Sequence, residues 1–328
     1  MSPRRRLRRA LVLCAVLAGA SPALALDESY PARPIKIIVG QGPGTTSDIL
    51  ARLVGAKLSE ILAQPVVIEG RPGAAGTIAA ATVANAPADG YTLLLASSSN
   101  LALATAQLQA LPYDPVSDFA PIRRMARIPW ALGVRATLPV KTVRELIAYA
   151  KANPGKLTGG STGPGSAAAL GLDMLSHNAG IDILNVSYKT SGASIQGVLA
   201  GEVDILFTDL ALIASHVQAG SVRLLAAAGP RRLRAFPDLP SLSELGIGEI
   251  VVEPWYGLVA PAATPAQVMT KLRDGLARAL RSAEVHDRIL ELGYDPIDED
   301  ASAFSAAIRA DIARYSAVVK QAKPAPER

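Results

Sequence analysis

Hydrophobic and polar positions alternate along this chain with two periods, that of a buried strand and that of an amphipathic helix. The apolar run at 35–39 predicts a strand, and apolar residues spaced three or four positions apart predict a helix over about 47–62. A short strand at 66–68, a helix of small residues at 74–85 and a strand at 91–96 follow. This order is typical of a parallel sheet covered by helices on both faces.

The same order recurs later in the chain. Gly42-Pro43-Gly44 precedes the first predicted helix, and Gly163-Pro164-Gly165 precedes another. The elements of this second copy are expected at 166–177 (helix), 183–188 (strand), 191–200 (helix) and 203–207 (strand). The fold class predicted from this repetition is α/β with two lobes of similar plan.

Proline-containing segments indicate where the chain passes between the lobes. One surrounds Pro129 and the other surrounds Pro254, and Thr264-Pro265 then begins the first of three amphipathic helices. The predicted division of the chain is a signal peptide at 1–25, a first lobe at 26–127 plus 251–328, and a second lobe at 128–250.

The first 25 residues have the layout of a secretory signal peptide. Five arginines lie within residues 1–10, an apolar run follows at 11–20, and Ala23 and Ala25 form a small-residue cleavage site after Pro22. The apolar run is about half the ~20 residues that a membrane-spanning helix needs. We therefore expect export to the periplasm and cleavage after about Ala25, through either the general or the twin-arginine route.

The net charge is misleading until this segment is set aside. The whole chain has 33 basic and 28 acidic residues, and five of the basic residues lie in 1–25, which has no acid. The remainder balances 28 against 28. A nucleic-acid-binding protein would show a basic stripe, whereas the only locally basic run is 231–234, which we interpret as a solvated loop.

Candidate metal and cofactor sites are poorly supported by the residue types. Cys14 leaves with the signal, so no thiolate site remains, and the three histidines are scattered without ligand spacing. Gly40 and Gly42, with Glu69 after the next strand, partly match a dinucleotide fingerprint, but Thr45 stands at the third glycine. No phosphate-binding G-K-[ST] sequence is present. We expect neither a metal nor a cofactor.

Two strand-to-helix turns carry the candidate chemistry. Residues 40–47 and 160–166 are small, polar and free of cations. At the carboxyl ends of parallel strands, such turns present the unpaired amides of the following helix, which suit an anion. A carboxylate there gains roughly 0.3–1 kcal/mol from the helix dipole and about 1.5–3 kcal/mol from each charge-assisted hydrogen bond. A few such contacts reach micromolar affinity.

An enzyme hypothesis competes for the second turn. Residues 159–163 satisfy G-x-S-x-G, the nucleophile turn of serine hydrolases, with Ser161 as the nucleophile after a strand at 156–158. The partners would be Asp209 and either His216 or His286, which lie on predicted helices or loops. An exported serine hydrolase is therefore the alternative to a binding protein.

Several segments together resemble the Bug family, the extracytoplasmic solute receptors of tripartite tricarboxylate transporters. The resemblance covers nearly all of the chain after the signal. It rests on residues 30–35 (YPARPI), 48–52 (DILAR), 64–76 (QPVVIEGRPGAAG), 88–94 (ADGYTLL), 111–115 (LPYDP), 118–121 (DFAP), 188–189 (YK), 237–241 (PDLPS) and 255–258 (WYGL).

The resemblance implies a two-lobed, type II-like periplasmic-binding-protein fold that closes about a hinge, as a Venus flytrap does. The ligand would be a small carboxylic acid held by backbone amides and ordered water, and the protein would be a receptor and not an enzyme. Its partner would be either the integral membrane permease subunits of a tripartite tricarboxylate transporter or a signalling protein. We expect a monomer that binds no nucleic acid.

The expected ligand contacts follow from the two turns and the strand ends beside them. Gln41 stands where the family usually has Phe, so an amide replaces an apolar wall. One carboxylate is assigned to Gly42, Gly44, Thr45, Thr46 and Ser47; a second ligand group to Ser161, Thr162, Gly163, Gly165 and Ser166; the floor to Ser97, Ser99 and Asn100; and the opposite wall to Tyr188, Thr208 and Asp209. Each Ser or Thr is equally a candidate for a helix cap, and Asp48 is interpreted as a first-turn helix acid.

Asp209 carries the expectation about ligand class. A fixed carboxylate at the mouth of the second lobe would repel a second ligand carboxylate and would attract an ammonium or accept a hydroxyl hydrogen bond. The alternative is that Asp209 caps the helix that begins at Leu210, with its charge turned away from the site.

Overall fold

The computed structural model describes residues 30–107, 110–163, 166–247, 250 and 252–322. The expected signal peptide lies outside these residues. Within the described part of the chain, no helix is long and apolar enough to cross a bilayer.

The first sheet has the strand order β11-β4-β10-β3-β1-β2. Its strands are β1 (Ile35–Val39), β2 (Val66–Gly70), β3 (Thr92–Ser97), β4 (Phe119–Arg127), β10 (Trp255–Pro261) and β11 (Asp295–Glu299). The predicted parallel pairing of the first three strands is confirmed, because β1 pairs in parallel with both β2 and β3. β10 runs antiparallel to β3 and β4, and β11 runs antiparallel to β4. The sheet therefore contains both parallel and antiparallel pairs. Two of its antiparallel strands, β4 and β10, connect it to the second sheet.

The second sheet repeats this plan. Its order is β7-β6-β8-β5-β9. The strands are β5 (Trp130–Arg135), β6 (Thr158–Ser161), β7 (Leu184–Ser187), β8 (Ile205–Asp209) and β9 (Val222–Ala227). β6 pairs in parallel with β7 and β8, whereas β5 runs antiparallel to β8 and β9. The strand expected at 156–158 thus lies later in the chain, and Ser161 is its last residue.

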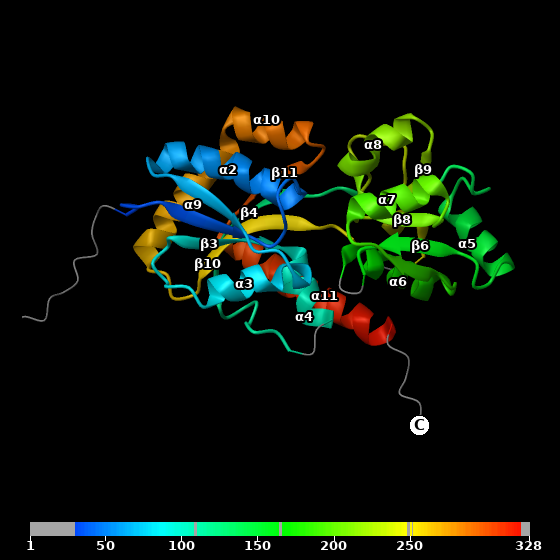
Figure 1. Ribbon diagram of the computed structural model, residues 1–328, viewed down its shortest axis with the longest axis horizontal. Helices are drawn as coiled ribbons and strands as arrows, with labels where there is room; N and C mark the ends of the chain where they lie inside the picture. The colour runs from blue at the N-terminus through cyan, green and yellow to red at the C-terminus, as the bar shows by residue number, and fades with distance from the viewer. Residues whose placement is uncertain (1–29, 108–109, 164–165, 248–249, 251, 323–328) are drawn as a thin grey trace, which may run out of the picture. The chain divides into compact units, whose positions relative to one another are not determined.

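Helices cover both faces of the first sheet (Figure 1). On one face lie α2 (Thr46–Leu62), α9 (Ala266–Arg281) and α10 (Ala283–Glu291). On the other lie α3 (Thr77–Ala84), which follows the short helix η1 (Ala74–Gly76), then α4 (Ala104–Gln107) and α11 (Ala301–Ala322). The core of this second face packs Ile38 and Leu94 of the sheet against Ala79 of α3 and Phe304 of α11.

Helices also cover both faces of the second sheet. α5 (Val143–Ala152) and α6 (Ala167–Ala179) contribute Leu146 and Leu172 to a core that includes Phe207 of β8. On the other face, α7 (Ser191–Ala200) and α8 (Leu210–Gln218) contribute Ile195 and Ile213 to a core with Leu206. Successive residues of β8 therefore face opposite cores, as the two-residue period of a strand requires.

The C-terminal helix α11 contacts the cores of both sheets. Phe304 near its start belongs to the first core, and Tyr315 near its end belongs to the second. The Trp255 indole N–H donates to the carboxylate of Asp311 between them at 2.6 Å. The predicted helices after Pro265 are confirmed as α9, α10 and α11. The lobe boundaries at 127/128 and 250/251 stay a prediction, because α11 is shared.

Candidate functional site

The first turn is held in shape by its own side chains. Ser47 donates to the Gln41 side-chain oxygen at 2.9 Å, and Thr45 donates to the Gly42 carbonyl at 2.8 Å. Thr45 and Ser47 hydroxyls lie 3.1 Å apart. Thr45 is the N-cap of α2, yet its side chain makes no capping hydrogen bond to the helix. The N-terminus of α2 therefore lacks the usual intramolecular acceptor.

Asp48 takes one amide of this turn. Its carboxylate accepts the Gly44 N–H at 3.0 Å and pairs with Arg52 one turn later, at 2.9 Å. The Arg52 hydrogen bond is the main cause that lowers the pKa of Asp48, against the opposing effect of partial burial. Asp48 is thus a charge-balanced first-turn acid, as the sequence indicated, and Gly44 is not an open donor.

The strand ends of the first sheet, where the floor of the ligand site was predicted, are tightly packed. A Cβ on Gly40 would lie only 2.6 Å from the Cα of Gly76, so β1 and η1 pack backbone to backbone here. Ser97 and Asn100 form a reciprocal capping box at η2 (Ser98–Leu103), with the Ser97 amide donating to the Asn100 side chain at 2.8 Å. Asn100 is buried and Ser99 is partly exposed. The side-chain oxygen of Asn100 is therefore committed to the cap.

The second turn is also built from self-bonded serines. Ser161 is buried, and its hydroxyl oxygen accepts the Gly163 N–H at 2.9 Å. Ser166 caps α6 by accepting from Ala169 at 3.1 Å, and it donates to the Gly163 carbonyl at 2.8 Å. Thr162 between them is exposed. Gly165, the other predicted contact in this turn, lies outside the described residues.

Asp209 joins the two sheets. One carboxylate oxygen accepts the Ala211 N–H at 2.9 Å and so caps α8. The other accepts the hydroxyl of Thr46, at the start of α2, at 3.3 Å. Thr46 also lies 3.1 Å from the hydroxyl of Tyr294. The structure thus shows the cap that was one alternative, but with the carboxylate turned toward the first turn and not away from it.

The surroundings of Asp209 alter its acidity. Its side chain is buried, and burial raises its pKa to about 6, while hydrogen bonds from Ala211, Thr46 and Tyr294 oppose the rise. Burial, followed by the nearby Asp209 charge, raises the pKa of Tyr294 to about 12 and also raises that of Tyr256. In all three groups burial shifts the pKa toward the neutral form, which is the response expected for ionisable groups removed from water.

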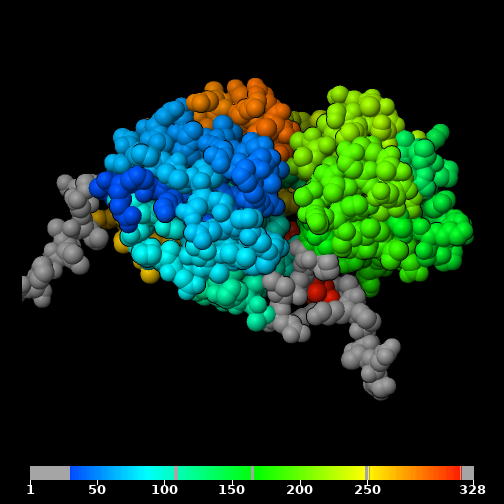
Figure 2. Space-filling model, viewed as in Figure 1, coloured from blue at the N-terminus to red at the C-terminus, as the bar shows by residue number. Residues whose placement is uncertain are grey.

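Tyr294 and Tyr256 were missed by sequence reasoning. Tyr294 follows α10, and Figure 2 shows the surface of α10 (orange) beside that of α2 (blue). Tyr256 lies in a segment on which the family resemblance rests, which was the one available signal. Neither residue lies near the turns in sequence.

Two predicted wall residues are not brought to this cluster. Thr208 is buried within β8, opposite Ala131 of β5. The Tyr188 hydroxyl donates to Glu202 at 3.1 Å and lies against Gly197 near the end of α7. Its phenol ring therefore lies near the C-terminal end of α7. The predicted ligand-binding turns, in contrast, lie at the N-terminal ends of helices. Their roles as ligand contacts stay predictions.

The hydrolase alternative finds no matching geometry among the described residues. The Ser161 hydroxyl is engaged by its own turn. Asp209 contacts Ala211 and Thr46 rather than a histidine, and His286 contacts Asp287 on the surface of α10. Among the described residues, no hydrogen bond joins His216 to Ser161 or Asp209. The hydrogen bond that joins the two sheets is instead that of Thr46 with Asp209, which does not pair a nucleophile with a base.

Comparisons with known proteins agree with a receptor. Residues 50–323 match the family described as "Tripartite tricarboxylate transporter family receptor". The chain is 34% identical to a UPF0065 protein of Bordetella bronchiseptica over 98% of this chain and 95% of that one. It is 32% identical to Protein BugT of Bordetella pertussis, over 93% of each.

Solved structures extend the similarity to the fold. An R. palustris protein solved with adipate has a TM-score of 0.81 and 33% identity, covering 89% of this chain and 98% of that one. MatC from Rhodopseudomonas palustris, with bound malate, has a TM-score of 0.79 and 29% identity, covering 88% of this chain and 100% of that one. The two-sheet α/β architecture is therefore that of a periplasmic binding protein, and these relatives are binding proteins and not enzymes.

Proposed function

Because this chain belongs to the receptor family of tripartite tricarboxylate transporters, we propose that it captures a small carboxylic acid between its two paired turns and delivers it to a membrane permease. The observation that carries the proposal is the 3.3 Å contact of Thr46 with Asp209, because it brings the first turn beside the end of β8. The neighbouring strand β6 runs parallel to β8 and leads into the second turn, so both turns belong to this region. The relatives solved with adipate and malate support a carboxylate.

The first carboxylate is assigned to the open N-terminus of α2. Thr45 leaves the first-turn amides without a side-chain acceptor, while Gly44 is occupied by Asp48. Amides of Thr46 and Ser47 are thus the proposed donors. Each charge-assisted bond contributes about 1.5–3 kcal/mol, so a few such bonds account for the roughly 8 kcal/mol of micromolar binding.

A substitution at Thr45 tests this site separately from the fold. Asp is a better N-cap than Thr, and this gain offsets the loss of the Thr45 hydrogen bond to the Gly42 carbonyl, so Thr45→Asp should have an unfolding midpoint close to that of the parent. The same carboxylate would occupy the α2 amides and repel the ligand, and carboxylate affinity should fall about tenfold or more, which is about 1.4 kcal/mol or more.

Calorimetry provides the measurement. Protein stripped of bound molecules by unfolding is titrated with mono-, di- and tricarboxylates and acidic amino acids, and one-to-one binding is expected. Thr142→Asp, which places the same residue at the N-cap of α5, is the matched control and should bind like the parent. Silence of the parent across the whole panel would contradict the proposed function.

The nature of the ligand is proposed from Asp209. Its second oxygen faces Thr46, so an ammonium or hydroxyl of the ligand could replace the Thr46 hydrogen bond. Asp209→Asn should then weaken binding of an amino or hydroxy acid by roughly 1.5–3 kcal/mol, and a plain dicarboxylate should bind no worse. Equal affinities of parent and variant for every ligand would leave Asp209 as a helix cap only.

The remaining parts of the proposal concern the cellular setting. We propose that residues 1–25 direct export to the periplasm and are removed after about Ala25, which the mass of the exported protein checks. We also propose that the receptor is a monomer, tested by sedimentation. Loss of ligand uptake in a deletion strain supports a permease partner, whereas intact uptake with a lost transcriptional response would indicate a signalling partner.

A further inference from the structure

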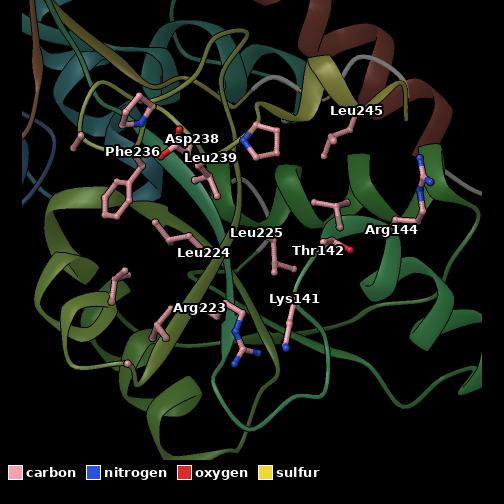
Figure 3. Close-up of a pocket in the computed structure, with 17 residues that line it drawn as sticks. Lys141, Thr142, Arg144, Arg223, Leu224, Leu225, Phe236, Asp238, Leu239 and Leu245 are labelled. Atoms are coloured by element: carbon pink, nitrogen blue, oxygen red, sulfur yellow. The ribbon is translucent and has the colours of Figure 1, made fainter.

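A groove of about 940 Å³ lies along the second sheet beside the edge strand β9. Figure 3 shows Leu224 and Leu225 of β9 between the segment that carries Lys141 and Thr142 and the loop that carries Phe236. The residues that line the groove include none of the predicted ligand contacts. It is therefore a separate feature of the molecule.

The wall of the groove is fixed by hydrogen bonds of its own. The Leu239 amide donates to the Phe236 carbonyl at 3.1 Å, and the Ala227 amide of β9 donates to the Pro240 carbonyl at 2.8 Å. The Arg232 side chain donates to another carbonyl of the same loop at 3.1 Å. A wall held in this way is already formed before any partner arrives, which lowers the ordering cost of binding.

The groove exposes apolar surface. Leu245 at its upper rim is 38% exposed, and Leu224, Phe236 and Leu239 are only partly buried. Single exposed apolar residues are common, but a contiguous apolar strip with a polar rim is typical of an interaction surface.

The rim is positively charged. Lys141, Arg144 and Arg223 line the groove with one acid, Asp238. Arg223 donates to the carbonyls of Leu138 and Val140 at 3.3 and 2.7 Å, and it forms no ion pair with any residue that the structure describes. The chain after the signal peptide has equal numbers of basic and acidic residues, so this excess is local. It favours a partner that brings carboxylates.

One segment of the groove also belongs to the family pattern. Residues 237–241, among those on which the resemblance rests, contribute Pro237, Asp238, Leu239 and Pro240 to the wall. None of these four residues is a predicted ligand contact. The segment also serves the fold, because its Pro240 carbonyl accepts the Ala227 amide and Ser241 caps η3 (Leu242–Leu245).

We propose that this groove docks an extended segment of a partner protein in which apolar residues are flanked by Asp or Glu. The apolar residues pack onto Leu224, Leu239 and Leu245, and the flanking carboxylates meet Lys141 and Arg144. The apolar contacts hold the complex, while the rim charges select acidic segments and speed their association.

Selection from a random peptide display library on the exported protein tests this assignment. Enriched peptides should combine Leu, Ile or Phe with neighbouring acids, and added salt should weaken their synthetic versions. The variant Lys141→Glu/Arg144→Glu should reduce peptide affinity about tenfold, and Leu245→Ser should reduce it without changing the salt dependence.

The control variant is Lys151→Glu/Lys156→Glu, which makes the same charge change at exposed positions of the same lobe outside the groove lining. It should bind the selected peptides like the parent. All variants should retain carboxylate binding, so failure here is distinguishable from failure of the proposed function.

Three outcomes would overturn the assignment. One is that no peptides are enriched. Another is that the enriched peptides lack acidic residues or bind the Lys141→Glu/Arg144→Glu variant as tightly as the parent. The third is a dimer in sedimentation that Leu245→Ser dissociates, because the groove would then hold a second copy of this chain.

Discussion

At the scale of single residues, Asp209 has a structural role, a shifted pKa and a proposed role in ligand binding. It is a helix cap, a partner of Thr46 and a buried acid at once. An acid whose pKa is higher in the folded protein binds its proton more tightly there, so folding is favoured at low pH. This contribution is complete below the unfolded value and is lost as pH rises through about 6.

The expected consequence is a pH-dependent cost in stability. A shift from about 3.8 to about 6 corresponds to roughly 3 kcal/mol at neutral pH. Asp209→Asn keeps a good N-cap and removes the charge, so the variant should show a smaller loss of unfolding free energy between about pH 4 and pH 7. Denaturant unfolding at both pH values measures this, with exposed Asp182→Asn as the control. The same pH slope in Asp209→Asn and the parent would contradict it.

At the scale of elements, helix α11 ties the two cores together. Its start packs with Phe304 in the first core and its end with Tyr315 in the second. Between them, Asp311 accepts the buried indole N–H of Trp255, and the Trp255 ring stacks edge-on against Phe304 at 5.1 Å. Helix α11 therefore packs against the first residue of β10, the strand by which the chain returns to the first sheet.

Removing this acceptor should cost stability. Asp311→Ala leaves the Trp255 N–H buried without its partner, so the unfolding free energy should fall by about 1–3 kcal/mol. Urea unfolding followed by tryptophan fluorescence measures the change. Arg309→Ala on the exposed side of α11 is the control and should lie within about 0.5 kcal/mol of the parent. An Asp311→Ala protein as stable as that control would show that the bond contributes nothing net.

At the scale of the whole molecule, the chain passes between the sheets at residues 128–129, before β5, and again just before β10. The Ile128 amide donates to the Pro254 carbonyl at 2.8 Å, so the two crossing segments are paired where they pass. A pair of adjacent crossings allows rotation of the sheets about one line, which is how hinge closure proceeds in two-lobed binding proteins. Ligand bound by both turns should favour the closed state.

Ligand-induced compaction is therefore expected. Small-angle scattering of stripped protein, with and without a carboxylate proven by calorimetry, should show a smaller radius of gyration in the bound state. Thr45→Asp protein at the same ligand concentration should show less change, because it binds less. Superimposable curves for parent protein with and without ligand would contradict closure on binding.

The sequence by itself determined the parts that depend on neighbours along the chain. The strand–helix alternation gave the parallel core β2-β1-β3, and glycine, serine and threonine located both turns, because turn conformation and capping depend on local residues. The same local rules could not show that β4 and β10 would pair antiparallel, because each belongs to a sheet assembled from distant segments.

Only the tertiary structure decided which residues meet at the site. Thr46 and Asp209 are 163 positions apart, and Thr46 and Tyr294 are 248 apart, so no spacing in the sequence connects them. Tyr188 shows the converse, because its backbone lies near the second turn while its side chain packs along α7 toward Glu202. Residue types close together in the chain determine the conformation of the turns. Burial and packing between distant segments determine which side chains lie beside those turns.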